Sequence, residues 1–350
     1  MNILILGSGG REHTIAWKIK QSKHCSQLFI APGNAGTALC GTNVSLKLHD
    51  FNAIENFCIS NKINMVVVGP EEPLVNGLVD HLNKKIPYAI VVGPQATGAQ
   101  LEGSKAYSKK FMHRLNIPTA AYAEFTTNNY DAGIAYINQH SLPIVLKADG
   151  LAAGKGVVIA QTHDEALFTF SEMLINKQFG DASSKVVIEA FLEGIEVSVF
   201  ALTDGKDYKI IGHAKDYKRI GEGDTGLNTG GMGCVTPVPF VTDGFMKIVE
   251  EKIIAPTVNG LYTQGITYKG FLFFGLMNNN GEPSVVEYNC RLGDPETEVV
   301  LPRLKNDLVE LFIAMHEGRL HDIEIEYDER CIATVMAVSG GYPGKYEVDK

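Results

Sequence analysis

The chain is organised around residues 285–296, which read VVEYNCRLGDPE. The first residues of this stretch favour a strand, and alternation along the strand puts Glu287 and Asn289 on one face. A carboxylate oxygen beside an amide oxygen is a ligand pair that Mg²⁺ carrying nucleotide phosphates accepts from a protein. Arg291 continues the same face and adds planar donors for phosphate or carboxylate oxygens. Taken alone, the stretch also fits a half-buried strand with a solvated polar face.

Composition places the chain among soluble globular proteins. It has 350 residues, of which 45% are hydrophobic and 20% charged, enough for two or more domains. A net charge of −9 without a long basic run argues against a general nucleic-acid or membrane-surface role. The six cysteines form no CxxC, which indicates reduced thiols in a cytosol-like compartment. The sequence shows neither a membrane-spanning apolar run nor a signal-peptide pattern.

The N-terminal residues predict a strand, a glycine turn and a helix. Residues 3–6, ILIL, fit a strand buried on both faces, and GSGG follows at 7–10. Such a turn makes an anion site from the backbone N–H groups at the helix start. Glu12 stands where the dinucleotide fingerprint GxGxxG needs glycine, so we reject a nicotinamide site. A tight turn without a ligand and a site for a phosphate-bearing small molecule both remain open.

The same rhythm repeats three times. Apolar runs at 28–30, 65–68 and 89–92 each precede a turn rich in glycine and proline. Strands that alternate with helical segments predict a parallel, doubly wound sheet over residues 1 to about 100. In such sheets ligands bind at the loops beyond the carboxyl ends of the strands.

A second strong signal lies at residues 147–159, KADGLAAGKGVVI. Small residues let backbone N–H groups close over phosphates, and Lys147 and Lys155 neutralise charge. The loop is not a Walker A motif, because its glycine spacing is one residue short and Gly156 replaces the required Ser/Thr. A strand at 157–160 follows it, so we predict a hairpin-like flap. A plain β-hairpin is the alternative, but such a turn gains nothing from two lysines.

Two further segments belong with the flap. Lys105 lies in a helix-like segment that ends before Pro118, where it is either a phosphate ligand or a solvated surface lysine. Residues 186–192 predict a strand that runs into a turn and is followed by Glu193 and Glu196. Such a hinge can offer backbone groups to an adenine edge and a carboxylate to ribose, although it is otherwise only a β-element with acidic flanks.

The C-terminal half contains one long polar stretch among periodic segments. Residues 215–233 are rich in glycine and have neither a helical nor a strand period, so we predict a substrate-binding loop, with disorder as the alternative. The other predicted elements are helical spacing at 245–261, a strand at 271–277 paired with 285–289, one amphipathic helix at 301–315, and a strand at 332–338. Because a lone terminal strand is poorly stabilised, we expect that the sequence stops inside a domain at Lys350.

Seven motifs in order carry a resemblance to a known family. They are GSGGREH at 7–13, APGNAGT at 31–37, VGPE at 68–71, LEGSK at 101–105, KADGLAAGKG at 147–156, NTGGMG at 228–233, and EYNCR at 287–291 running into GDPET at 293–297. The whole chain resembles the phosphoribosylamine–glycine ligases (glycinamide ribonucleotide synthetases), an ATP-grasp family of purine biosynthesis.

The resemblance implies an α/β fold. An N-terminal doubly wound parallel sheet domain is followed by ATP-grasp domains, namely a small lid and a central α+β domain, and by a truncated C-terminal domain. The implied boundaries are 1–102 for the N-terminal substrate-binding domain, 121–190 for the lid, 103–120 with 191–328 for the central domain, and 329–350 for the start of the C-terminal domain.

The resemblance also implies a reaction. It joins glycine to 5-phosphoribosylamine through a glycyl phosphate, and it converts ATP to ADP and phosphate with Mg²⁺ or Mn²⁺. The implied enzyme is cytoplasmic, is a monomer or a weak homo-oligomer, and binds neither nucleic acid nor membrane. No Ser or Cys nucleophile is expected, and Cys290 is expected to be a packed thiol.

Matching the family motifs onto this sequence implies a role for each site residue. The metal ligands are Glu287 and Asn289. The ATP-binding residues are Lys105, Lys147, Gly150, Gly154, Lys155, Gly156, Glu189, Phe191, Leu192 and Glu196. The substrate-binding residues are Gly9, Gly10, Asp216, Lys218, Arg291, Gly293 and Asp294. The residues given a catalytic role are Arg291, Lys218 and Asp294.

The sequence departs from the family pattern at four places. Lys215 stands for the usual Gln, Tyr217 for His and Leu292 for Phe, and family members continue past Lys350. Three rival interpretations remain: another ATP-grasp carboxylate–amine ligase of purine metabolism, a truncated ATP-binding chain without turnover, and one part of a longer multifunctional polypeptide.

Overall fold

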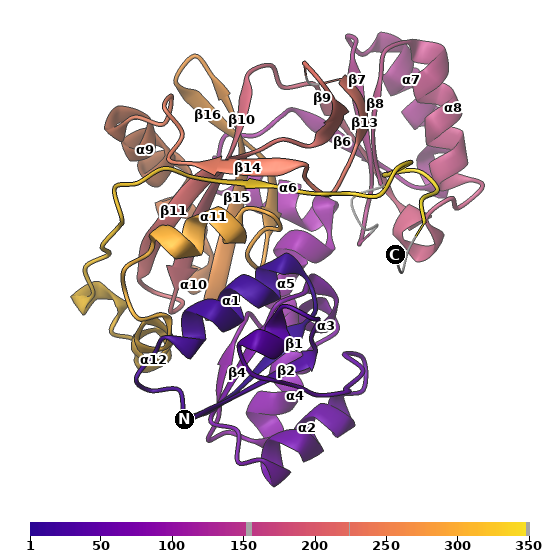
Figure 1. Ribbon diagram of the computed structural model, residues 1–350. Coiled ribbons are helices and arrows are strands. Elements are labelled where there is room, and N and C mark those ends of the chain that lie inside the picture. Colours follow the sequence, from indigo (N-terminus) through magenta and orange to yellow (C-terminus); the bar gives the residue numbers. More distant parts are fainter. Residues whose placement is uncertain (152–155, 224, 348–350) are drawn as a thin grey trace.

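Three sheets and one two-stranded ribbon organise the molecule (Figure 1). The computed structural model describes residues 1–151, 156–223 and 225–347. Within these residues a parallel sheet forms the N-terminal part, a small antiparallel sheet carries its own helices, and a larger antiparallel sheet lies between them. The predicted α/β class with an N-terminal doubly wound parallel sheet is confirmed.

The N-terminal sheet has the strand order β3-β2-β1-β4-β5, and every pairing in it is parallel. Its strands are β1 (Asn2–Gly7), β2 (Gln27–Pro32), β3 (Thr42–Asn43), β4 (Met65–Val68) and β5 (Ile90–Val92). The helices that connect and follow these strands are α1 (Gly10–Lys20), α2 (Phe51–Ser60), α3 (Glu71–Val75), α4 (Leu78–Lys85) and α5 (Ala96–Gly103).

The apolar run of β1 is buried on both of its faces. Ile3 and Ile5 share a hydrophobic cluster with residues of α1, whereas Leu4 and Leu6 share another with residues of α2 and α4. All four side chains are fully buried, and each such burial stabilises the fold by about 1.5–3 kcal/mol. The predicted double layer of helices therefore follows from the unbroken apolar run.

The small antiparallel sheet has the order β6-β9-β7-β8 and its own hydrophobic cluster. Its strands are β6 (Tyr122–Phe125), β7 (Ile144–Ala148), β8 (Val157–Ala160) and β9 (Val186–Ala190), and its helices are α7 (Tyr130–Gln139) and α8 (His163–Leu174). Strands β7 and β8 pair in antiparallel register on either side of the glycine-rich loop, which confirms the predicted hairpin.

The larger antiparallel sheet has the order β16-β15-β10-β11-β14-β17. Its strands are β10 (Ile195–Thr203), β11 (Tyr208–Asp216), β14 (Gly233–Thr236), β15 (Gly270–Asn279), β16 (Glu282–Asn289) and β17 (Ile332–Val335). The helices around it are α6 (Lys105–Arg114), α9 (Asp243–Val249), α10 (Ala255–Thr263), α11 (Thr297–Arg303) and α12 (Leu308–Glu317). The predicted pairing of residues 271–277 with 285–289 is confirmed.

The remaining elements are short. They are η1 (Thr37–Leu39), η2 (Thr127–Asn129), η3 (Gly180–Ser184), the π-helical turn η4 (Glu250–Ile254) and η5 (Leu320–Asp322). Among the described residues, no helix combines the length and the apolar character needed to cross a membrane.

The prediction that residues 215–233 lack regular structure is wrong. The segment begins in β11 and then forms a ribbon of two antiparallel strands, β12 (Arg219–Gly221) and β13 (Thr225–Asn228), before it enters β14. None of the residues of its two strands is fully buried, and the strands are too short for an apolar alternation that a sequence pattern could reveal. Its base is held by backbone bonds, from Thr229 N to Lys218 O at 2.8 Å and from Met232 N to Tyr217 O at 2.7 Å.

The prediction of one helix over residues 301–315 is also wrong. Helix α11 ends at Arg303, and α12 begins at Leu308 after a bend. The Asp307 side chain caps α12 by accepting from Val309 N at 2.9 Å and from Glu310 N at 3.3 Å. An Asp N-cap satisfies backbone donors that a continuous helix would have paired internally, so the cap stabilises the break.

We predict that Asp307→Ala lowers the free energy of unfolding by about 1–2 kcal/mol, because it removes the cap and also the bond from Ser22 Oγ to Asp307 Oδ2 at 2.8 Å. Urea unfolding monitored by circular dichroism measures the change. The control Lys247→Ala lies on the exposed face of α9 and is expected to shift stability by less than about 0.5 kcal/mol. Equal shifts in the two variants would contradict the capping role.

Candidate active site

One cavity brings together the two segments that the sequence singled out. Its volume is about 210 Å³, and it lies between α5, α6, the flap and β16. Most of its polar lining is charged. The lining residues include Glu71, Glu102, Lys105, Lys109, Lys147, Gly150, Gly156, Glu189, Glu287, Asn289 and Arg291. The flap and the acid–amide strand therefore share a cavity although about 140 residues separate Lys147 from Glu287 in sequence.

A bulge in β16 sets the orientation of the acid–amide pair. Val285 lies opposite Leu276 and Glu287 lies opposite Gly275, so Val286 is an extra residue without a partner on β15. The Val286 carbonyl instead accepts a hydrogen bond from Lys147 Nζ at 3.1 Å. Bulges re-aim side chains in this way beside many active sites. Beyond the bulge normal alternation resumes, which keeps Glu287 and Asn289 on the cavity wall.

Three lysines meet around the flap. Lys105 Nζ donates to Gly150 O at 3.1 Å. Lys147 and Lys109 share the Glu189 carboxylate, with Nζ–O distances of 3.0 and 2.9 Å. Burial and the neighbouring Lys147 lower the pKa of Lys105, while burial lowers the pKa of Lys109 to about 8. The three lysines therefore lie together in a cavity whose described lining has four cationic and four carboxylate side chains.

The base of the flap is fastened to the start of α6. Asp149 Oδ1 accepts from Ser104 Oγ at 2.9 Å and from Ala106 N at 3.1 Å. Ser104 is itself the N-cap of α6 and accepts from Tyr107 N at 3.1 Å. An acidic side chain at a helix N-terminus satisfies free N–H groups and complements the helix dipole. The arrangement fixes Lys105, the first residue of α6, beneath the flap.

Glu287 is ionised by its surroundings. Burial alone would raise the pKa of its carboxyl group, but Lys218, Lys147, Lys105 and Arg291 together lower it below the ordinary value. A carboxylate and the Asn289 amide supply hard oxygen donors, which fit Mg²⁺ when phosphate oxygens and waters complete its coordination. Across the part of the chain that the structure describes, no group of three or more His, Cys, Asp or Glu side chains is arranged to hold a metal.

Arg291 is held by partners from two other segments. Its Nη2 lies 2.9 Å from Glu102 Oε1, and its Nε lies 3.4 Å from Glu71 Oε2. Burial works against its charge, but the carboxylates of Glu102 and Glu71 outweigh burial and raise the pKa of Arg291. Neighbouring Cys290 is a buried free thiol, as expected, and donates to Glu102 Oε2 at 3.1 Å.

A second group of charged residues lies beside the N-terminal turn. A Cβ atom added to Gly9 would lie 2.7 Å from Asp294 Oδ2, and one added to Gly10 would lie 2.2 Å from Glu298 Oε1. The two carboxylates therefore lie close against the backbone of the turn. Glu12 Oε2 accepts from Gly9 N at 2.6 Å, so Glu12 satisfies a donor that a dinucleotide phosphate would need, which agrees with rejecting a nicotinamide site.

Two further predicted residues, Asp216 and Lys218, lie just before the ribbon. Lys218 pairs with Glu196. Burial opposes the charge on Lys218, but Glu196 and then Glu287 outweigh burial and raise the pKa of Lys218. Asp216 ends β11, and burial together with Glu296 raises its pKa to about 7. Gly293 packs so closely on Glu296 that an added Cβ would lie 2.2 Å from Glu296 Oε2.

Of the remaining predicted residues, Glu189 lines the cavity, and four others lie away from the lining or outside the described part of the chain. Phe191 and Leu192 follow the end of β9 and are not among the residues that line the cavity. Gly154 and Lys155 lie outside the described residues. Glu189 lies in the wall of the cavity, where it pairs with two lysines.

Sequence reasoning missed four charged residues of this region. Glu71 and Glu102 lie inside motifs that carried the resemblance, but no role was assigned to them. Lys109 lies in the same helix-like segment as Lys105, and a single helical lysine gives no sequence signal of burial. Glu298 follows the GDPE run and faces Gly10. The one signal in the sequence is that Glu71 and Glu102 lie within motifs that match the family.

Two departures from the family pattern form a pair. Lys215 Nζ lies 5.0 Å from the centroid of the Tyr217 ring, a cation–π contact at the start of the ribbon. Leu292 is 1% exposed and belongs to a hydrophobic cluster, so it is a packing residue.

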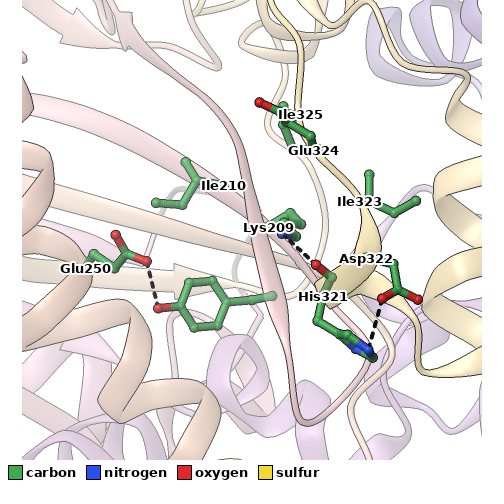
Figure 2. A pocket seen from close by; sticks show the side chains of 9 residues that line it. Lys209, Ile210, Glu250, His321, Asp322, Ile323, Glu324 and Ile325 are labelled. Carbon is green, nitrogen blue, oxygen red and sulfur yellow. Dashed lines mark hydrogen bonds and ion pairs between the residues drawn. The ribbon is translucent and has the colours of Figure 1, made fainter.

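A more open hollow of about 500 Å³ lies elsewhere, between β11 and the segment around η5 (Figure 2). Its polar groups bind one another. Tyr208 OH donates to Glu250 at 2.9 Å, Lys209 Nζ donates to His321 O at 3.4 Å, and His321 lies 3.2 Å from Asp322. Neither Lys147 nor Glu287 lines this hollow.

Comparisons with known proteins decide the family. The model for the N domain of phosphoribosylglycinamide synthetase matches residues 1–102, and the model for its ATP-grasp (A) domain matches residues 103–297. The chain belongs to this family. It is an ATP-dependent ligase with the ATP-grasp fold that the sequence predicted.

Individual relatives support the assignment over the whole chain. A phosphoribosylamine–glycine ligase of Chlorobaculum tepidum is 49% identical over 100% of this chain and 82% of its own length, and that of Escherichia coli O157:H7 is 48% identical over 99% and 80%. The crystal structure of the Thermotoga maritima ligase is similar with a TM-score of 0.84 and 34% identity, covering 99% of this chain and 83% of that one. A biotin carboxylase of Campylobacter jejuni, with a TM-score of 0.69, 15% identity and coverage of 93% and 73%, shares the fold.

We predict that Glu298→Gln makes this ligase less sensitive to alkaline pH. Burial, and then the charge of Asp294, raise the pKa of Glu298 to about 9 from the ordinary 4.5. Between these values the unfolded chain has already lost the proton that the folded chain keeps, so stability falls as pH rises. The variant is therefore expected to gain stability relative to the parent from about pH 5 to about pH 9, with a constant difference above that. Urea unfolding across this range tests the prediction, with exposed Glu282→Gln as control; a constant difference from pH 5 onward would refute it.

Proposed function

We propose that this ligase joins glycine to 5-phosphoribosylamine and converts ATP to ADP and phosphate. One observation carries the proposal: Lys105 and Lys147 line the same cavity as the Glu287–Asn289 pair, in a chain about half identical to enzymes named for this reaction. The names of the relatives support the substrates, and the electrostatics of the cavity supports the triphosphate.

The chemistry requires activation of a carboxylate, which is a poor acyl donor. In the proposed first step, a glycine carboxylate oxygen attacks the γ-phosphorus, the bond to the β–γ bridging oxygen breaks, and glycyl phosphate and ADP form. In the second step, the amine nitrogen of phosphoribosylamine attacks the acyl carbon, phosphate leaves with its bridging oxygen, and the amine loses a proton. Water would hydrolyse the acyl phosphate, so the cavity must close during turnover.

The proposed ATP site lies beneath the flap. Lys105 and Lys147 bind phosphates, with Gly150, Gly154, Lys155 and Gly156 closing over them. The adenosine lies toward the end of β9, within reach of Glu189, Phe191, Leu192 and Glu196. The grouping of Lys105 and Lys147 in one cavity supports this placement, because each ammonium group can donate to phosphate oxygens.

Mg²⁺ or Mn²⁺ would be held by Glu287 and Asn289, together with phosphate oxygens. When bound, the ion would neutralise charge that develops on the transferring phosphoryl group. Four nearby cations oppose a bare divalent ion at Glu287, so we expect metal to enter with the nucleotide.

The proposed glycine and phosphoribosylamine sites lie between the N-terminal turn, the ribbon and the start of α11. The residues assigned to substrate are Gly9, Gly10, Asp216, Lys218, Arg291, Gly293 and Asp294. Among them Arg291, Lys218 and Asp294 are proposed to act in catalysis, with the two cations stabilising the phosphoryl group or the substrate carboxylate. Asp216 has a pKa near neutrality, which suits a group that exchanges a proton with an amine.

We further propose a cytoplasmic enzyme that acts as a monomer or a weak homo-oligomer on small molecules, without nucleic acid or membrane. The six cysteines are free thiols, which agrees with a reducing compartment. The decisive measurement is ADP formation by this chain with glycine and freshly made phosphoribosylamine. ATP binding by calorimetry without glycine-dependent ADP formation would favour an ATP-binding chain without turnover and would overturn the proposal.

We predict that Glu287→Gln lowers glycine-dependent ADP release on the order of 1000-fold, because the variant keeps the side-chain volume but loses the proposed metal ligand. Coupled-enzyme assays measure the rate, and circular dichroism checks the fold. Glu282→Gln is the matched control: it lies on the same strand, its side chain is 70% exposed, and it pairs with Lys252. Near-normal turnover of the Glu287 variant at saturating Mg²⁺ would overturn the metal assignment.

We predict that Lys147→Ala raises the KM for ATP about 10- to 100-fold, because the variant loses a charge-assisted contact to phosphate. Glu189 retains Lys109 as a partner, so the substitution leaves no unpaired buried carboxylate. The control Lys110→Ala removes an exposed lysine that pairs with Glu124 and is expected to leave the KM unchanged. An unaltered ATP dependence of the Lys147 variant would count against the phosphate assignment.

A further inference from the structure

Glu102 is a buried carboxylate to which the proposed reaction assigns no role. It lies near the end of α5, and its side chain is 7% exposed. Both of its oxygens are engaged by consecutive residues of the segment after β16. Oε1 lies 2.9 Å from Arg291 Nη2, while Oε2 accepts from Cys290 N at 2.8 Å and from Cys290 Sγ at 3.1 Å. A single carboxylate therefore fixes both the backbone and the side chain at this point.

The two carboxylates around Arg291 are not equivalent. Glu71 lies 3.4 Å from Arg291 Nε, and its side chain is 28% exposed. Glu102 is closer and more deeply buried, and it has the additional bonds from Cys290. Glu102 is therefore the rigid partner, and Glu71 is the outer partner that an incoming anion can replace.

Stability does not explain this buried pair. Removing a carboxylate and a guanidinium from water costs free energy that their attraction offsets only in part, and apolar pairs of similar volume stabilise a fold equally well. Burial raises the pKa of Glu102, and the charge of Arg291 opposes that rise. The ion pair instead holds the guanidinium in a defined orientation, which an apolar neighbour would not do.

The contacts of Arg291 leave donors for a ligand. Three of its N–H groups already have acceptors. Nη2 donates to Glu102, Nε donates to Glu71, and Nη1 donates to the Leu292 carbonyl at 3.3 Å. Each Nη carries a second N–H, and Arg291 lines the cavity. Lys105 begins the next helix three residues after Glu102, so one short segment positions two cations of the cavity.

We propose that Glu102 is the positioning residue for Arg291, and that it holds the guanidinium in the orientation that presents its free N–H groups to the transferring phosphoryl group or the substrate carboxylate. The inference rests on the proposed role of Arg291 in catalysis. Glu102 itself acts only through Arg291 and does not touch the reacting atoms.

A double-variant cycle tests this role in the whole chain. Glu102→Gln, Arg291→Lys and the combined variant are compared for kcat and for the KM of ATP and glycine. We expect Glu102→Gln to lower kcat by up to about 100-fold, as misplacement of a catalytic group does, and to change the KM for ATP less than 3-fold. In the Arg291→Lys background, Glu102→Gln is expected to lower kcat less than 3-fold further, because the group that it positions is already gone.

The matched control is Glu55→Gln. Glu55 is a partly buried carboxylate of the N-terminal region that pairs with His81 at 2.8 Å, far from the proposed machinery, and its variant is expected to keep the parental kcat. If Glu102→Gln does not fold, Glu102→Asp replaces it in the same cycle, because it keeps the charge and shortens the reach.

The outcomes separate the two proposals. Parental kcat in Arg291→Lys would overturn the role of Arg291 and with it the proposed function of this site. A large effect of Arg291→Lys with an equal, additive effect of Glu102→Gln would overturn the positioning role alone. A crystal structure of Glu102→Gln in which the Arg291 guanidinium keeps its place would overturn it independently of turnover.

Discussion

Four cations surround one carboxylate in this molecule, and the resulting charge balance is the constraint on which the rest of the site depends. Lys218, Lys147, Lys105 and Arg291 together hold Glu287 in its ionised form although burial opposes its charge. In a partly dry cavity such attractions and repulsions are several times stronger than in water. The cations repel one another, so each needs its own oxygen partner to stay in place.

These partners explain why the cavity needs several separate parts of the fold. Each cation is held by an oxygen from a different element. Lys218 pairs with a carboxylate at the start of β10, and Lys147 pairs with one on β9. Lys105 donates to a carbonyl of the flap, and Arg291 pairs with a carboxylate of α5. None of these contacts is local in sequence. The bulge in β16 and the cap of α6 are local features of the chain, but they position charged groups in one cavity.

The two errors in the predicted elements have a common cause. Hydrophobic periodicity reports only elements that bury one face, and the ribbon over residues 219–228 buries neither face. Residues 301–315 do carry a continuous apolar pattern, because α11 and α12 pack into the same hydrophobic cluster from two directions. The pattern is therefore the same as for one straight helix, and the Asp307 cap is the local signal that separates the two cases.

The parallel N-terminal sheet, the flap hairpin, the pairing of the acid–amide strand and the family could all be predicted from the amino-acid sequence. Unbroken apolar runs, glycine spacing and ordered motifs are local properties of the chain. The sequence also identified Glu287, Asn289 and Lys147 as residues of one cavity. Which charges meet became visible in the folded chain alone. Glu189 pairs with two lysines, Glu102 pairs with Arg291, and Glu298 lies against the N-terminal turn. Burial and charge pairing depend on distances between segments that are far apart in sequence, and no periodicity along the chain encodes those distances.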